Sequence, residues 1–240
     1  MHILITRPQE SCSALQDKLQ RLGHHIITDP LIHILPRNPK IIFKSLPPTF
    51  EAIVTTSQQA IICLAKIIDR RDFPLWCVGV ESAKVAQNLG FQNIHWAEGS
   101  AENLLKQLVT TTTLSSRQPI IHLSGDVIRL DVAKSLQEQG IPAQRIIVYS
   151  TQEATAFRKE TQNALKTSIL DAVLFYSPRT AHIFQNLCQT SQLEKFCQSI
   201  KAICLSDAIK SGISKLPWQN IQVAKKTTTD DLLIALMMAD

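Results

Sequence analysis

Serines follow several of the apolar, strand-like runs of this chain, where each can present its hydroxyl and nearby backbone N–H groups to an anion. In open sheets of parallel strands, ligands bind beyond the carboxyl ends of the strands. Helices that begin there attract carboxylates and phosphates to their N-termini. The set therefore predicts an anion-lined edge, although each serine alone could be only a helix N-cap. The serines are Ser57, Ser82, Ser124, Ser177 and Ser206.

Familiar catalytic and cofactor motifs are missing. The chain has no Gly-x-Gly-x-x-Gly or Walker motif and no Gly-x-Ser-x-Gly elbow, so nucleotide binding and a serine-hydrolase triad have no support. Its six cysteines form no Cys-x-x-Cys pair, and we interpret them as buried, reduced thiols. The histidines are scattered, which disfavours a metal site. No metal or other cofactor is therefore expected.

The charge and the apolar pattern limit the partners. A net charge of +5 is weaker than a dedicated nucleic-acid binder usually carries, and it suits an anionic small ligand. The longest apolar runs are too short to span a bilayer, and the first residues lack the features of a signal peptide. We therefore expect a cytoplasmic protein with no membrane and no nucleic-acid partner.

The chain repeats itself, which indicates a duplicated half. The run from Glu51 to Ser57 aligns with the run from Asp171 to Ser177, each an acidic residue, a buried-strand pattern and a serine. Residues 91–97 align with 218–224, and both precede a helical stretch with paired leucines. Several matches in the same order are hard to explain by chance, so we infer a duplication.

Each half alternates short apolar runs with helical stretches, which is typical of parallel strands covered on both faces. The expected strands are 2–6, 25–28, 51–55, 75–79, 93–96, 119–123, 145–149, 171–175, 201–205 and 221–224. The expected helices are 9–22, 57–68, 81–89, 101–111, 127–139, 155–166, 179–189, 207–215 and 229–238. The pattern predicts an α/β fold with two similar lobes, each an open, mostly parallel sheet flanked by helices.

Two stretches break this alternation at the same point of their repeats. Residues 29–48 hold five prolines, which disfavour helix and stiffen a linker, and residues 146–151 form a strand-like run that contains Tyr149. We interpret residues 31–48 and 146–151 as a two-stranded connector between the lobes. Tyr149 would then lie where the lobes face each other, although simple packing with its hydroxyl in water is the alternative.

Taken in order, short motifs along nearly the whole chain resemble the uroporphyrinogen-III synthase family. Each motif alone is weakly specific, whereas their order and spacing are specific. Ser82 stands where the family has threonine, which keeps the hydroxyl. The motifs are Ile5-Thr-Arg-Pro8, Ile53-Val-Thr-Thr-Ser57, Val78-Gly-Val-Glu-Ser-Ala83, Ser100-Ala-Glu102, Gly125-x-x-x-Arg129, Gly140 followed by Val148-Tyr-Ser-Thr151, Phe175-Tyr-Ser-Pro178 and Ile203-Cys-Leu-Ser206.

The resemblance implies a reaction that needs no cofactor. The substrate would be hydroxymethylbilane, a linear tetrapyrrole with many carboxylates, and the product uroporphyrinogen III, formed with loss of water and inversion of ring D. It implies that Tyr149 assists departure of the hydroxyl as a hydrogen-bond donor or general acid. The expected carboxylate contacts are Arg7, Ser57, Ser82, Ser124, Gly125, Ser177 and Ser206, with Arg129 and Arg179 as weaker candidates that could be ordinary surface residues.

The resemblance also implies a discontinuous domain organisation. Residues 1–30 would join residues 152–240 in one lobe, and residues 49–145 would form the other. We expect a monomer that could receive its substrate from hydroxymethylbilane synthase. Two rival functions remain open: a non-catalytic tetrapyrrole- or anion-binding protein on the same scaffold, and a receiver-like module. The second would need an acidic pocket at the strand ends, where this chain has serine and threonine.

Overall fold

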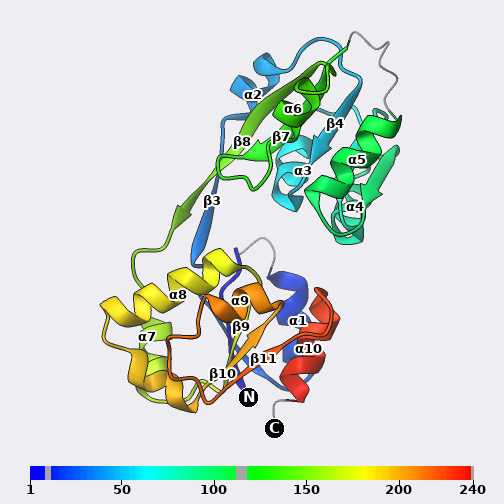
Figure 1. The fold of residues 1–240 in the computed structure, drawn as a ribbon. Helices are drawn as coiled ribbons and strands as arrows, with labels where there is room; N and C mark the ends of the chain where they lie inside the picture. The colour runs from blue at the N-terminus through cyan, green and yellow to red at the C-terminus, as the bar shows by residue number, and fades with distance from the viewer. Residues whose placement is uncertain (9–11, 112–117, 239–240) are drawn as a thin grey trace. The chain divides into compact units, whose positions relative to one another are not determined.

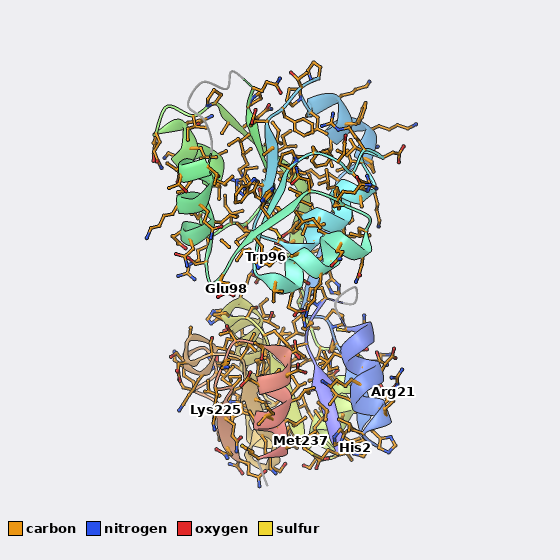
Figure 2. The ribbon with its side chains drawn as sticks, turned by 90° about the vertical axis from the view of Figure 1, so that its right-hand side faces the viewer. His2, Arg21, Trp96, Glu98, Lys225 and Met237 are labelled. Atoms are coloured by element: carbon orange, nitrogen blue, oxygen red, sulfur yellow. The ribbon has the colours of Figure 1, made fainter. Side chains whose placement is uncertain are left out.

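The computed structural model describes residues 1–8, 12–111 and 118–238. The chain divides into two compact units, each described here by itself (Figure 1). The terminal unit consists of Met1–His33 and Gln152–Asp240, and the central unit of Ile34–Thr151. Both ends of the chain therefore belong to one unit, in which Figure 2 labels His2 and Met237. None of the helices in the described residues is long and apolar enough to cross a bilayer.

The terminal unit is built on a five-stranded sheet in which every neighbouring pair is parallel. The strand order is β11-β10-β9-β1-β2, so the first strand of the chain is an inner strand that lies between β9 and β2. The strands are β1 (His2–Ile5), β2 (His25–Thr28), β9 (Ala172–Phe175), β10 (Lys201–Cys204) and β11 (Asn220–Val223).

Helices cover both faces of this sheet because its strands are apolar on both sides. Leu4 and Phe175 pack in a core with α7 and α8, whereas Ile3 and Leu174 pack in a second core with α1 and α10. Figure 1 shows α7 and α8 on one side of the sheet and α1 and α10 on the other. The helical segments are α1 (Ser13–Arg21), α7 (Lys159–Lys166), α8 (Pro178–Thr190), the 3₁₀ helix η2 (Glu194–Ser199), α9 (Asp207–Ser211) and α10 (Thr229–Met237).

The central unit is built on a sheet with the order β3-β8-β7-β4-β5-β6. The pairs from β8 to β6 are parallel. β3 runs antiparallel to β8, because Arg37 N donates to Val148 O while Ala154 N donates to Leu31 O. The strands are β3 (Ile32–Pro36), β4 (Ala52–Thr55), β5 (Leu75–Val78), β6 (Ile94–Ala97), β7 (Ile120–Gly125) and β8 (Ala143–Glu153).

This sheet is also covered on both faces. Ile53 and Leu123 pack in a core with α3 and α4, and Val54 and Ile120 pack in another with α5 and α6. The helices are α2 (Pro39–Ser45), α3 (Gln58–Ala65), α4 (Val80–Asn88), α5 (Ala101–Thr111) and α6 (Val132–Gln137). The sequence prediction of two mostly parallel sheets flanked by helices is therefore confirmed.

The two sheets share one topology. The order β11-β10-β9-β1-β2 of the terminal unit corresponds to β6-β5-β4-β7-β8 of the central unit. In each unit, three of these five corresponding strands come from one half of the chain and two from the other, and β3 is an additional strand of the central unit. The chain passes between the units within β3, after His33, and within β8, after Thr151.

Residues 31–48 differ from the sequence prediction in their local structure. The expectation that prolines keep this segment free of helix is wrong, because it contains α2. Pro39 is tolerated there since it stands in the first turn, where its missing N–H costs nothing, and Asn38 caps the helix through Lys40 N. The compact central unit takes in most of 31–48 and all of 146–151, and the connector role of these segments stays a prediction.

Three predicted helices are shorter in the structure. The helix predicted at 127–139 begins only at Val132, because residues 126–131 form a turn that ends at the capping residue Asp131. The helix predicted at 155–166 begins at Lys159, and the one predicted at 207–215 ends before Gly212. The first residues of the helix predicted at 9–22 lie outside the described residues.

The buried carboxylate of Asp29 joins the two segments of the terminal unit, and its loss should destabilise the protein. Its side chain is 3% exposed, its Oδ2 accepts a 2.9 Å hydrogen bond from Arg158 N, and its Oδ1 lies 3.8 Å from Arg158 Nε. Asp29→Ala would remove this buried acceptor and leave the partly buried Arg158 N–H unpaired, so we expect the free energy of unfolding to fall by about 1–3 kcal/mol in denaturant titrations.

Asp230→Ala is the matched control. The pair of Lys18 and Asp230 joins the same two segments at 2.7 Å, but its side chains are 52% and 78% exposed. Because exposed pairs contribute little, this variant should lose no more than about 1 kcal/mol. Equal losses in the two variants would contradict the assignment of Asp29 as a buried brace.

Candidate functional site

Tyr149 lies on β8 in the central unit, opposite the last residue of β7, and its hydroxyl is held by Ser57. The Tyr149 hydroxyl and Ser57 Oγ lie 3.0 Å apart, and the Tyr149 residue is 8% exposed. Ser57 is the N-cap of α3, where its Oγ also accepts from Gln59 N. Burial raises the pKa of Tyr149, as do Cys63 and Asp126, while the Ser57 hydrogen bond opposes the shift. The phenol is therefore protonated at neutral pH and can donate a hydrogen bond or a proton.

A β-bulge places this side chain. In the pairing of β7 with β8, Ser124 lies opposite Ile147, but Gly125 lies opposite Tyr149, so Val148 is the extra residue. Consecutive side chains of a regular strand point to opposite faces. Here Val148 and Tyr149 pack in the same core, beside α3. The bulge therefore turns Tyr149 toward Ser57.

Gly125 is the surface on which the Tyr149 ring rests. A Cβ built on Gly125 would meet Cε2 and Cζ of Tyr149 at 2.6 Å and its hydroxyl oxygen at 2.9 Å. No real side chain tolerates such distances. Glycine is needed here for the close approach of a ring.

Arg145 clamps the turn that contains Gly125. Its Nε donates to Ser124 Oγ at 2.8 Å, and its Nη2 donates to the carbonyl oxygens of Gly125 at 2.8 Å and Asp126 at 3.0 Å. Its Nη1 lies 3.6 Å from Asp131 Oδ2. Sequence reasoning missed this residue, for which the only signal was a charge inside the β8 pattern. The clamp uses the planar fork of the guanidinium and fixes the backbone beneath Tyr149.

Buried His122 borders the clamp and is not a proton donor at neutral pH. Its Nδ1 lies 3.5 Å from Asp131 Oδ1 and its side chain is fully buried. Burial lowers the pKa of His122 to about 4, against the opposing effect of Asp131. His122, which belongs to β7, is therefore neutral and places no second positive charge beside Arg145.

Asp126 is the second residue that sequence reasoning did not select. Its Oδ1 accepts from Val127 N at 2.9 Å, from Thr151 N at 3.1 Å and from Thr151 Oγ1 at 3.2 Å. These hydrogen bonds lower the pKa of Asp126 against a raising effect of its partial burial. A fixed, ionised carboxylate therefore stands at the end of β7.

The terminal unit carries an arginine and a tyrosine at the corresponding edge. The Arg7 guanidinium lies over the Tyr176 ring, 4.3 Å from its centroid. Burial raises the pKa of Tyr176 to about 12, although Arg7 opposes the shift. Arg7 is half-buried and follows β1, which lies between β9 and β2 in this sheet. The ring contact positions this guanidinium.

The other predicted site residues of the terminal unit differ in whether their side chains already make hydrogen bonds within the protein. Ser177 is the N-cap of α8 and its Oγ bonds Thr180 N and Thr180 Oγ1. Ser206 is the N-cap of α9 without a side-chain capping bond. Arg179 pairs with Glu153 at 2.8 Å on the surface.

Other predicted residues of the central unit are distributed between core and surface. Ser82 and Ser124 are 6% and 2% exposed. The Ser124 hydroxyl donates to Gly125 O and accepts from Arg145, so it serves the clamp. Arg129 is exposed in the turn before α6. Of the predicted site residues, the structure brings together Tyr149, Ser57, Gly125 and Ser124, and it places Arg7, Ser177 and Ser206 at one edge of the other sheet.

A hollow of about 590 Å³ in the terminal unit lies away from these residues. Its lining includes His2, His25 and Glu160, from the amino-terminal ends of β1, β2 and α7. In parallel sheets the opposite edge is the one that binds ligands. The described residues contain no cluster of histidine, cysteine, aspartate or glutamate that could hold a metal ion.

Comparison with known families shows the family to which this chain belongs. The model of the family uroporphyrinogen-III synthase HemD matches residues 13–234. The chain belongs to this family. A curated relative, the porphyrin biosynthesis protein HemD of Ruminiclostridium josui, is 24% identical over 256 residues that cover 98% of this chain and 48% of the relative. The chain thus spans about half the length of this relative.

Solved structures of uroporphyrinogen-III synthases share the fold. The Helicobacter pylori enzyme aligns over 100% of this chain and 99% of its own, with a TM-score of 0.65 and 17% identity. A mutant of the Thermus thermophilus enzyme aligns over 99% of this chain and 96% of its own, with a TM-score of 0.57 and 13% identity. At these identities the likeness concerns the fold.

Tyrosine titration should reveal the burial of both phenols. The chain has two tyrosines, and in the folded state both pKa values are raised above the usual value of 10.0. We expect the ultraviolet absorbance of tyrosinate to rise at higher pH in the folded than in the unfolded protein. Tyr149→Phe and Tyr176→Phe assign the two steps. A folded-state step at or below the unfolded value would contradict this expectation.

The same shifts predict how stability depends on pH. Between the unfolded and folded pKa values the folded state binds more protons, so the free energy of unfolding decreases as pH rises. We expect this loss to begin near 10.0, where an unfolded tyrosine titrates, and to continue through the folded values. Denaturant titrations of the two phenylalanine variants should show a smaller loss than the wild type over this range.

Gly125→Ala should disrupt the contact between Gly125 and Tyr149. Because Arg145 holds the backbone, the ring must move, and the hydrogen bond to Ser57 should be lost. Overpacking of this kind lowers the free energy of unfolding by about 1–3 kcal/mol. Gly212→Ala is the control, since its nearest atom would lie at 3.3 Å. A Gly125→Ala structure with Tyr149 unmoved would show that the contact constrains nothing.

Proposed function

We propose that this chain converts hydroxymethylbilane into uroporphyrinogen III. The family match over residues 13–234 supports this proposal. The observation that carries it at the level of residues is the buried, protonated Tyr149 hydroxyl at 3.0 Å from Ser57. It stands at the carboxyl edge of a parallel sheet, where ligands of such folds bind.

The reaction removes one water from hydroxymethylbilane and joins the two ends of this linear tetrapyrrole. The carbon–oxygen bond of the hydroxymethyl group breaks, the hydroxyl leaves with a proton as water, and an azafulvene-like cation remains. Ring D attacks this cation through its substituted carbon to form a spiro intermediate. Rearrangement and loss of a proton from a pyrrole carbon then give the macrocycle with ring D inverted. The released proton balances the one that left with water.

Positioning is the main task of the protein, because the pyrroles supply the nucleophile. Holding reactants in a productive geometry can supply roughly 7–11 kcal/mol in favourable cases. We propose that Tyr149 hydrogen-bonds the leaving hydroxyl and transfers a proton to it. Ser57 orients the phenol, and the bulge at Gly125 aims it.

We propose that the substrate carboxylates bind at the turns that follow the strands. Arg7 lies over the Tyr176 ring and Ser206 makes no side-chain capping bond in the terminal unit, while Arg129 is exposed in the central unit. The backbone N–H groups beside Ser57, Ser82, Gly125 and Ser177 would contribute at the N-termini of α3, α4 and α8 and at the end of β7. Arg179 would first have to leave Glu153.

We propose that the enzyme works as a cytoplasmic monomer and receives its substrate from hydroxymethylbilane synthase. Six free, buried cysteines support a reducing compartment. Residues 31–48 and 146–151 would connect a lobe of 1–30 and 152–240 to a lobe of 49–145.

A non-catalytic tetrapyrrole- or anion-binding protein is the competing function. Such a protein needs the anion-binding turns but has no use for a buried, protonated phenol held by a serine. Supplying hydroxymethylbilane and separating the isomers by chromatography distinguishes the two. Formation of isomer III supports the enzyme, and isomer I alone excludes it.

Tyr149→Phe tests the residue that carries the proposal. The ring and its packing on Gly125 remain, whereas the proton donor is lost, so we expect turnover to fall about ten- to a hundredfold. Initial rates of isomer III formation measure the effect, and the circular dichroism spectrum should be unchanged.

Tyr176→Phe is the matched control, because its buried hydroxyl is inaccessible to a ligand. It should keep turnover within about threefold of the wild type, a change well below the usual contribution of a general acid. Unchanged turnover in Tyr149→Phe would remove Tyr149 from the mechanism.

A further inference from the structure

The Asp126 carboxylate is fixed by three donors on one oxygen. Val127 N, Thr151 N and Thr151 Oγ1 all bond Oδ1, at 2.9, 3.1 and 3.2 Å. No hydrogen bond or ion pair to Oδ2 was found within residues 1–8, 12–111 and 118–238. The residue is only half-buried. One oxygen thus anchors the group, and the other is available to a ligand.

Asp126 and Tyr149 lie next to each other at the end of β7. Asp126 N donates to Tyr149 O at 3.1 Å, and Asp126 binds Thr151, two residues beyond Tyr149 on β8. Side chains two residues apart on a strand share a face. Burial is the main cause of the raised pKa of Tyr149, and the nearby negative charge of Asp126 acts in the same direction.

A negative charge is unexpected at an edge that should bind a polycarboxylate. Arg145 does not neutralise it, because its guanidinium bonds the carbonyls of Gly125 and Asp126 and lies 3.6 Å from Asp131. Asp126 must therefore repel the substrate before reaction. The same charge attracts the cation that forms when the hydroxyl leaves. Only an interaction that is stronger in the transition state than in the bound substrate raises kcat.

We propose that Asp126 is a catalytic residue that faces the azafulvene-like cation and stabilises it as the carbon–oxygen bond breaks. This inference rests on the proposed function and deepens it. Tyr149 supplies the proton to the departing hydroxyl, and Asp126 provides a fixed negative charge beside the pyrrole nitrogen that becomes positive. The carboxylate stays ionised throughout and forms no covalent bond. Its three hydrogen bonds hold it in place, so little reorganisation accompanies the reaction.

Asp126→Asn separates charge from structure. The amide oxygen can still accept from Val127 N and Thr151, but the negative charge is gone. We expect kcat for isomer III to fall about ten- to a hundredfold, less than for a fully buried electrostatic group because Asp126 is partly in water. The KM should stay unchanged or decrease, since repulsion of the substrate carboxylates is relieved.

Asp126→Ala and Glu138→Gln complete the test. Asp126→Ala also removes the brace to Thr151, and Glu138→Gln removes an exposed charge beyond the end of α6. Glu138→Gln should match the wild type. If Asp126→Asn keeps wild-type kcat while Asp126→Ala is impaired, Asp126 is only a brace and the inference is wrong. A raised KM with unchanged kcat in Asp126→Asn would equally overturn it.

The wild-type reaction distinguishes failure of this inference from failure of the proposed function. If the wild type yields isomer I alone, the chain is not the proposed synthase. If the wild type yields isomer III and Asp126→Asn is equally fast, the synthase assignment stands and only the role of Asp126 is lost.

Discussion

The packing of the Tyr149 ring on the backbone of Gly125 is the constraint on which the central unit's site depends. A methyl group at Gly125 would lie 2.6 Å from the ring, so the contact exists only because that position has no side chain. The bulge directs the ring onto Gly125, and three hydrogen bonds from Arg145 keep the Gly125 backbone from moving away. Ser57 then sets the hydroxyl direction. A flexible aromatic side chain is thereby held in one orientation, as a positioned acid requires.

Charges at the two sheet edges are arranged differently. In the terminal unit, Arg7 lies over an aromatic ring, which leaves its positive charge uncompensated by a carboxylate in that contact. In the central unit, Arg145 hydrogen-bonds the backbone of the turn after β7, and Asp126 supplies a negative charge beside the Tyr149 phenol. Binding of substrate carboxylates and stabilisation of a developing cation are opposite demands. Under the proposed function, arginines and helix N-termini would meet the first demand, and the fixed Asp126 carboxylate would meet the second.

Duplication and exchange of strands explain why each unit needs distant parts of the chain. The terminal sheet places β1 between β9 and β2, so segments more than a hundred residues apart form its centre. Asp29 and Asp171 reinforce this pairing, since Asp29 accepts from Arg158 N and Asp171 accepts from His2 N. Asp171 stands just before β9, at the edge opposite the one that binds ligands in parallel sheets, and its hydrogen bond to β1 gives it a structural role.

The sequence by itself determined most of the elements and the family, because apolar periodicity, serine caps and short motifs are read directly from the chain, although it missed α2. Ser57 and Ser177 were recognisable as residues that begin helices, and Tyr149 was recognisable by its place in a motif. Only the tertiary structure decided which strands are neighbours, and with them the partners of Tyr149. The bulge after Ser124, the clamp by Arg145 and the hydrogen bonds of Asp126 all join β7 to β8 or its end. No local pattern encodes them, since a one-residue shift in strand register reverses the face on which each side chain lies.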